Sequence, residues 1–198
     1  MNAKSLRIAL LIPLFLLAAG CGADIGSPNQ STSTALPIRV VRADLASGAA
    51  SVEELAAWSQ LAVLGTARTA RQEPNQVDPT IVSTVQSFTV DQLVWGTAPR
   101  DTVEVRFTGG VVRDEVPDPY LLQLEGQPQF DAGHQYFLVL LGPSPDGTYM
   151  VLGGPQGRYE VTDGRLVAVP GTYADPVVAS LNGTEFEAAA QELTGMTR

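Results

Sequence analysis

Glycine and proline restrict the fold of this chain most, because 19 Gly and 14 Pro among 198 residues divide it into short segments. Several segments have strand patterns. Val103, Val105 and Phe107 alternate with charged residues, as in a strand with one buried face. The continuous apolar run 136–141 predicts a central strand, and Asp163-Gly164 between two further runs predicts a tight hairpin.

The longest predicted strand covers residues 81–95. Val82, Phe88 and Val90 alternate within it, whereas the next apolar residues, Leu93 and Val94, break the period. A β-bulge near residues 91–92 would restore the alternation and let the strand curl, as strands do in a barrel. A long connection, residues 109–135, follows the next strand and contains a short apolar element at 121–124.

Each end of the folded part has a helix signal. Ser51 and Glu54 are spaced as a capping box before a short helix that ends near residue 60. Thr184 and Glu187 are spaced in the same way before a C-terminal helix, which Gly195 is expected to end. With about six or seven short strands between the helices, the expected fold is mainly β (α+β), a small barrel with flanking helices.

Residues 1–20 have the pattern of an export signal. Lys4 and Arg7 precede an apolar run, 8–19, that is shorter than the about 20 residues needed to span a bilayer. The run leads into Leu17-Ala-Ala-Gly-Cys21, which resembles the lipobox of bacterial lipoproteins, although Ala18 stands where Leu, Val or Ile is usual. The resemblance implies cleavage between Gly20 and Cys21 and lipidation of Cys21. An ordinary secretory signal is the alternative, but it would leave a lone Cys in an exported protein.

Residues 21–36 are predicted to form a flexible tether, because they are rich in Gly, Ser, Thr and Pro and poor in apolar residues. Residues 37–198 then form a single domain. Removing residues 1–20 takes away Lys4 and Arg7, so 10 of the 12 basic residues remain against 21 acidic ones, a net charge of 10 − 21 = −11. Nucleic acid and anionic lipid repel such a domain, so we expect no nucleic-acid partner, and contact with the membrane only through lipidated Cys21.

The order of several segments is similar to that of a known family. These segments are the capped helix that begins at Ser51, then 61–67, 88–90, 93–96, Gly109-Gly110, 130–140 and 156–161. The chain resembles, over about residues 51–169, exported bacterial proteins of unknown function whose barrel is similar to the OB-like fold of netrin and tissue-inhibitor-of-metalloproteinase domains. The resemblance implies an OB-like β-barrel. Two residues depart from the family pattern, Trp95 where Lys is usual and His134 where an acid is usual. Inhibitors of this type chelate a protease zinc through a free N-terminal Cys, and lipidation of Cys21 would prevent that.

Composition excludes several kinds of chemistry. Lys4 is the only lysine, so a folded-domain lysine nucleophile or phosphate-loop lysine is absent. One Cys and one His cannot form a Cys/His zinc site or a disulfide. His134 is the one histidine available as a general base, but the nucleophile-elbow pattern Gly-x-Ser-x-Gly is missing, so we predict a turn histidine and no catalytic residue.

An acidic, proline-rich stretch offers an alternative. Asp114, Glu115 and Asp118 carry carboxylates of the kind that ligate calcium or serve in glycoside hydrolysis. Their spacing fits no EF-hand, and such stretches are usually only solvated, so we predict no metal and no cofactor. A hydrolase acting on cell-wall or carbohydrate material through these residues remains the alternative function.

The stretch Gly153–Arg158 has the strongest features of a binding site. Its glycines expose backbone amides, and Arg158 can bind a carboxylate through two parallel hydrogen bonds. Gln156, Arg158 and Trp95 are therefore the candidate ligand-binding residues. In the alternative interpretation Arg158 pairs locally beside a glycine-rich turn and Trp95 fills the core.

Taken together, these patterns predict an extracytoplasmic lipoprotein with a non-catalytic binding or adaptor domain. Its expected partner is an envelope protein, peptide or glycan, bound on the barrel surface or by the 109–135 connection. A structural or stress lipoprotein without a ligand is a third possibility.

Overall fold

The structure is a computed structural model that describes residues 35–42, 48–74, 81–98, 100–113 and 117–196. The predicted signal peptide, Cys21 and most of the tether lie outside these residues. Residues Ala35–Arg198 form one compact unit. Its strands are β1 (Ile38–Val41), β2 (Leu61–Pro74), β3 (Val82–Gly96), β4 (Thr102–Val112), β5 (Tyr120–Leu124), β6 (Gln135–Leu141), β7 (Met150–Val151), β8 (Arg158–Thr162) and β9 (Arg165–Ala168). The helices are α1 (Val52–Trp58), α2 (Pro176–Leu181), α3 (Phe186–Met196) and a short 3-10 turn, Gly154–Gly157.

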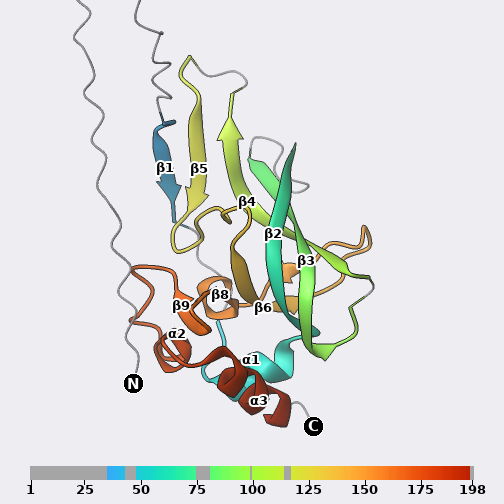
Figure 1. The fold of residues 1–198 in the computed structure, drawn as a ribbon. Coiled ribbons are helices and arrows are strands. Elements are labelled where there is room, and N and C mark those ends of the chain that lie inside the picture. Colours follow the sequence, from blue (N-terminus) through green and yellow to red (C-terminus); the bar gives the residue numbers. More distant parts are fainter. Residues whose placement is uncertain (1–34, 43–47, 75–80, 99, 114–116, 197–198) are drawn as a thin grey trace, which may run out of the picture. The chain divides into compact units, whose positions relative to one another are not determined.

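These strands form one curled, half-barrel sheet in the order β1-β5-β4-β3-β2-β6-β8-β9, with β7 paired to β6 (Figure 1). The prediction of a mainly β fold is confirmed. The predicted strand count of about six or seven is wrong, because nine strands pair. The sequence pattern missed β1, whose Ile38, Val40 and Val41 are exposed, so that this strand has no alternation of buried and polar residues.

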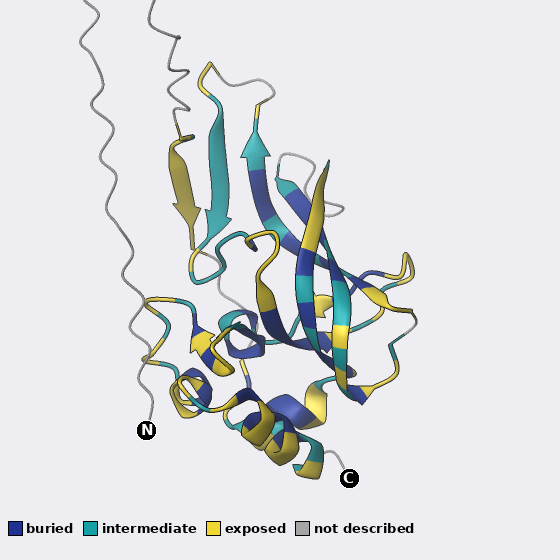
Figure 2. Cartoon of the chain, viewed as in Figure 1, coloured by how far each residue is buried: buried dark blue, intermediate teal, exposed yellow. Residues whose placement is uncertain are grey.

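The continuous apolar run of β6 is explained by its central place. This strand pairs with β2, β7 and β8, and its residues Tyr136–Leu140 are all buried (Figure 2). Side chains therefore face apolar surroundings on both sides of the sheet at this position, and alternation is lost. The prediction of a central strand at 136–141 is confirmed.

The two faces of the sheet cover different hydrophobic clusters. On the concave face, alternate residues of β2, β3, β4 and β6 surround Phe88, Phe107 and Phe130. On the other face, Phe137 and Tyr159 pack against α1, α2 and α3. In Figure 1 these three helices gather at the end of the sheet away from β1 and β5. Because successive strand residues point to opposite faces, the same strands contribute residues to both clusters.

Register shifts between β2 and β3 bend the sheet. The pairing of β2 with β3 goes from Leu64↔Gln92 to Gly65↔Val90 and leaves Asp91 as an extra residue. This β-bulge confirms the one predicted near residues 91–92, and a second lies between Trp95 and Leu93. The backbone of Tyr149 also bonds to that of β4. Its N–H donates to the carbonyl oxygen of Glu104, and its carbonyl oxygen accepts from the backbone N–H of Arg106, both at 2.8 Å. This isolated bridge links β4 to the residue that precedes β7.

The helix ends agree only partly with prediction. Ser51 accepts a hydrogen bond from the backbone N–H of Glu54, as expected for the N-terminus of α1. The predicted box at Thr184 does not form, since this hydroxyl donates to the carbonyl oxygen of Leu181, at the end of the additional helix α2. Gly195 does not end α3, which continues to Met196. The hairpin at Asp163-Gly164 is confirmed, with both residues at positive φ.

A candidate binding pocket beside Arg158

Strand alternation brings four side chains of β6, β8 and β9 to the concave face. Tyr136 pairs with Glu160, which pairs in turn with Val167. Arg158 lies two residues before Glu160 on β8, and so points to the same face. This face therefore carries one cation and one carboxylate next to each other on β8, flanked by a tyrosine and a valine.

Arg158 is buried, with only 5% of its surface exposed. Its terminal nitrogens donate to the backbone carbonyl oxygens of Pro128 and Gln129, the latter at 2.9 Å. Its guanidinium carbon lies 3.6 Å from the centroid of the Phe130 ring and 5.5 Å from that of Tyr136. No carboxylate of the described residues forms an ion pair with it. The guanidinium has more N–H groups than these two carbonyl acceptors use.

The 128–131 segment lies across the concave face because Phe130 anchors it. The Phe130 ring makes edge-to-face contacts with Phe88, Phe107 and Tyr136, at centroid distances of 4.9, 5.3 and 5.0 Å. Aromatic packing and the two Arg158 hydrogen bonds thus hold the same segment. The hydroxyl oxygen of Tyr136 also accepts a hydrogen bond from the backbone N–H of Asp131 at 3.0 Å.

A pocket of about 250 Å³ opens between this segment, β8 and the end of β9. Its polar lining comes from Gln129, Asp131, Tyr136, Arg158 and Glu160. The apolar lining comes from Pro128, Val167, Ala168, Val169 and Pro170. A few convergent polar groups beside an apolar wall are typical of a small-ligand site.

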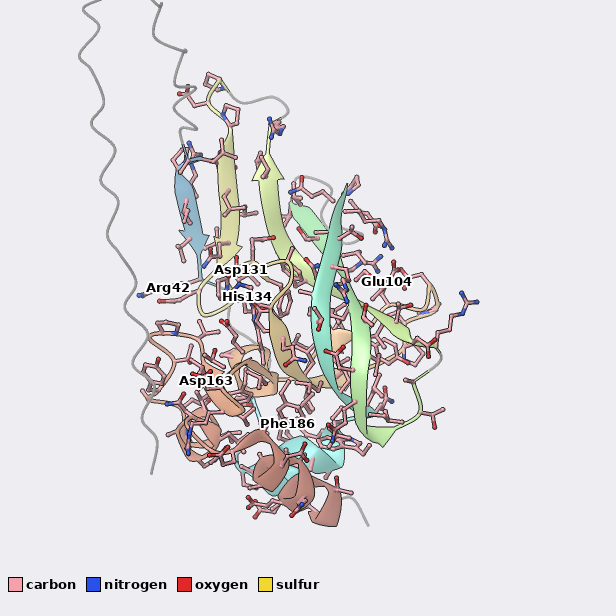
Figure 3. The ribbon with its side chains drawn as sticks, in the orientation of Figure 1. Arg42, Glu104, Asp131, His134, Asp163 and Phe186 are labelled. Atoms are coloured by element: carbon pink, nitrogen blue, oxygen red, sulfur yellow. The ribbon has the colours of Figure 1, made fainter. Side chains whose placement is uncertain are left out.

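The charges of the pocket are ordered by depth. Arg158 is buried, whereas the Glu160 side chain is 36% exposed and Asp131 is exposed. Figure 3 places Asp131 and His134 side by side, in the turn that leads into β6. The backbone N–H of His134 donates to the carbonyl oxygen of Asp131 and closes this turn, and His134 Nδ1 lies 2.7 Å from Glu160 Oε1. The pocket therefore has a positive floor and a negatively charged rim.

The pKa values of three residues reflect this arrangement. Burial lowers the pKa of Arg158 to about 10. Burial likewise raises the pKa of the Tyr136 hydroxyl. The hydrogen bond to Glu160 raises the pKa of His134 above its ordinary value. Arg158 remains charged at neutral pH, and so the floor of the pocket is cationic.

The structure separates the three candidate residues named from the sequence. Gln156 lies under the helices. Its side-chain oxygen accepts a hydrogen bond from the backbone N–H of Ala49, and its side-chain nitrogen donates to the carbonyl oxygen of Ala49 and to the carboxylate of Asp175. Trp95 is in the same helix-side cluster, and its indole N–H donates to Ser59 Oγ at 2.8 Å. Of the three, Arg158 alone lines the pocket. Gln156 and Trp95 instead connect the sheet to its helices.

The sequence patterns did not indicate the other polar lining residues, Gln129, Asp131, Tyr136 and Glu160. Alternation along β8 was sufficient to place Glu160 beside Arg158, but no pattern indicated that residues 128–131 cross the concave face. Asp114 and Glu115 of the acidic stretch lie outside the described residues, as does Cys21. Within the described part of the chain, no cluster of three or more His, Cys, Asp and Glu side chains is placed to hold a metal ion.

Comparison of the chain with protein-family models, with curated proteins and with solved structures gives no match. None of the helices in the described ranges has both the length and the apolar character to cross a membrane.

Proposed function

We propose that this chain is a bacterial lipoprotein, anchored outside the cytoplasmic membrane by lipidated Cys21, whose domain binds a small ligand or the end of a larger one in the Arg158 pocket. The anchor is supported by the lipobox-like segment Leu17–Cys21 and by the lack of any other Cys in the chain. The binding role is supported by one observation above all. A buried guanidinium, without a carboxylate partner among the described residues, lines an open pocket.

We further propose that the half-barrel is a variant of the OB-like fold. In support, β2, β3, β4 and β6 curl around one aromatic cluster, and the Tyr149 bridge joins β4 to the β6–β7 side of the curl. OB-type barrels of this size fill their interior with side chains and bind ligands on the outer surface or at the rim. The position of the pocket at the edge of the Phe130 cluster fits that rule.

The anchor is tested by expressing the full chain and its Cys21→Ser variant in a bacterial host. We expect an acyl mass on Cys21 and recovery of the wild-type protein with the membrane fraction, whereas the Cys21→Ser protein is released. Because Cys21 is the only cysteine, any thioether-linked lipid is assigned without ambiguity. A Cys21→Ser protein that stays with the membrane would contradict the proposal.

The binding role is tested by blocking the pocket. Val167 lines the pocket and is 41% exposed, so Val167→Trp fills it without disturbing a core. Val40→Trp, at another exposed strand position, is the matched control. A ligand that binds only the folded protein raises its melting temperature. We expect a small-molecule extract of the bacterial envelope to stabilise the wild-type and Val40→Trp proteins but not Val167→Trp. Equal stabilisation of all three proteins, or of none, would reject the pocket as the binding site.

A further inference from the structure

The charges of the Arg158 pocket limit the chemical class of its ligand. An anion alone would be attracted to Arg158 but must pass Asp131 and Glu160 at the rim. A cation alone would be attracted to the rim but would face the buried guanidinium at the floor. A molecule that carries a carboxylate and an ammonium group close together matches both the cationic floor and the acidic rim.

The rim carboxylates are available to such an ammonium group. Glu160 uses Oε1 in its contact with His134, and Oε2 has no hydrogen-bond partner among the described residues. The Asp131 carboxylate likewise accepts no hydrogen bond from the part of the chain that the structure describes, and its backbone N–H is already held by Tyr136. Charge-assisted hydrogen bonds to a ligand ammonium would satisfy these oxygens.

The volume of the pocket suits a small ligand. The volume of about 250 Å³ equals about eight water molecules, at roughly 30 Å³ each. That space is sufficient for a small amino acid such as alanine or valine, or for one residue at the end of a larger molecule. The apolar lining on the β9 side, Val167, Val169 and Pro170, would contact the aliphatic side chain of such a ligand.

We infer that the pocket binds a small zwitterion of the α-amino-acid class, with its carboxylate on Arg158 and its ammonium group between Glu160 and Asp131. This inference rests on the proposed binding function and specifies its ligand class. Arg158 supplies the N–H groups that the Pro128 and Gln129 carbonyls leave unused. Glu160 and Asp131 discriminate against simple anions by charge repulsion.

Three probes of nearly equal shape test the inference. Alanine carries both charges, alaninamide carries only the ammonium group and propionate carries only the carboxylate. Each is titrated into the full chain in detergent, and backbone amide NMR shifts are followed. We expect alanine to give saturable, millimolar-range shifts at Asp131, Glu160 and Val167, and alaninamide and propionate to bind about tenfold more weakly, the loss expected for one charge-assisted hydrogen bond.

Glu160→Gln is the informative variant, because Glu160 is partly exposed and its one described side-chain contact is with His134. We expect it to weaken alanine binding about tenfold and not to weaken propionate binding. Glu185→Gln, which removes a carboxylate from the exposed Arg165 pair, is the matched control and should leave the affinity for alanine unchanged. The amide spectrum of each variant reports directly whether the fold is retained.

Several results would overturn the inference. One is alaninamide or propionate binding as tightly as alanine, and another is an affinity for alanine that Glu160→Gln leaves unaltered. If alanine causes no saturable shift but envelope extract still stabilises the wild-type protein and not Val167→Trp, the ligand class is wrong and the binding function stands. If both effects are absent, the proposed binding function is wrong as well.

Discussion

The guanidinium carbon of Arg158 lies 3.6 Å from the centroid of the Phe130 ring, while its terminal nitrogens donate to the carbonyl oxygens of Pro128 and Gln129. The same side chain thus fastens the segment that crosses the concave face and supplies the cation at the floor of the pocket. A buried charge of this kind has a structural role whether or not a ligand is bound.

The structural role predicts a large loss of stability in Arg158→Met. The substitution keeps a similar apolar stem but leaves two carbonyl oxygens without their donor, at an expected cost of about 3 kcal/mol in the free energy of unfolding. Arg39→Met is the control, because Arg39 also lies over an aromatic ring, that of Tyr120 at 3.9 Å, but on an exposed edge strand. There we expect a change below about 0.5 kcal/mol. Urea unfolding of both variants measures the difference, and similar losses would show that burial is not the cause.

The sequence predicted local structure well where a single pattern determines it. Alternation in β4, the apolar run of β6 and Asp163-Gly164 each depend on nearby residues only, and all three are found as expected. The bulge at Asp91 was also predictable, because an extra residue in β3 interrupts the alternation of apolar and polar residues in the sequence.

Tertiary contacts explain what the sequence did not reveal. Strand β1 pairs in parallel with β5, which comes about 80 residues later, and no local signal encodes such a partner. Gln156 and Arg158 are two residues apart in sequence, yet one lies beneath the helices and the other in the pocket. Gln156 lies within the turn Gly154–Gly157, whereas Arg158 is the first residue of β8, and the geometry of this turn could not be read from the glycines alone.

The His134–Glu160 pair predicts a pH-dependent contribution to stability. Because the hydrogen bond to Glu160 raises the folded-state pKa of His134, the contribution is complete below about pH 6.5, the unfolded pKa, and disappears as pH rises through the folded pKa. The chain has a single His, so its imidazole NMR signal is unambiguous. We expect Glu160→Gln to lower the His134 pKa, and Asp131→Asn to lower it less, because Asp131 acts only by charge at longer range. An unchanged pKa in Glu160→Gln would exclude the pair in solution.

Gln156 predicts a second site of large stability loss, away from the pocket. Its amide joins Ala49, just before α1, to Asp175, the N-cap of α2. Gln156→Leu keeps the volume but leaves the buried N–H and carbonyl groups of Ala49 without partners, so we expect a loss of about 2 kcal/mol. Gln191→Leu, at an exposed position of α3, should change stability by less than about 0.5 kcal/mol. A Gln156→Leu protein as stable as wild type would show that these hydrogen bonds contribute nothing net.

Two glycines predict effects of opposite sign for the same substitution. Gly195 lies inside the last turn of α3, and an added Cβ would meet no atom within 4 Å. Because glycine weakens a helix interior, Gly195→Ala should raise the free energy of unfolding by about 0.5 to 1 kcal/mol. Gly164 has a φ of 77° in the β8–β9 turn, where alanine is strained, so Gly164→Ala should lower it by about 1 to 2 kcal/mol. Thermal and urea unfolding of the two variants give the signs directly. A stabilising Gly164→Ala would mean that the turn in solution differs from the Asp163-Gly164 geometry, whereas a destabilising Gly195→Ala would mean that α3 ends at Gly195 as the sequence pattern suggests.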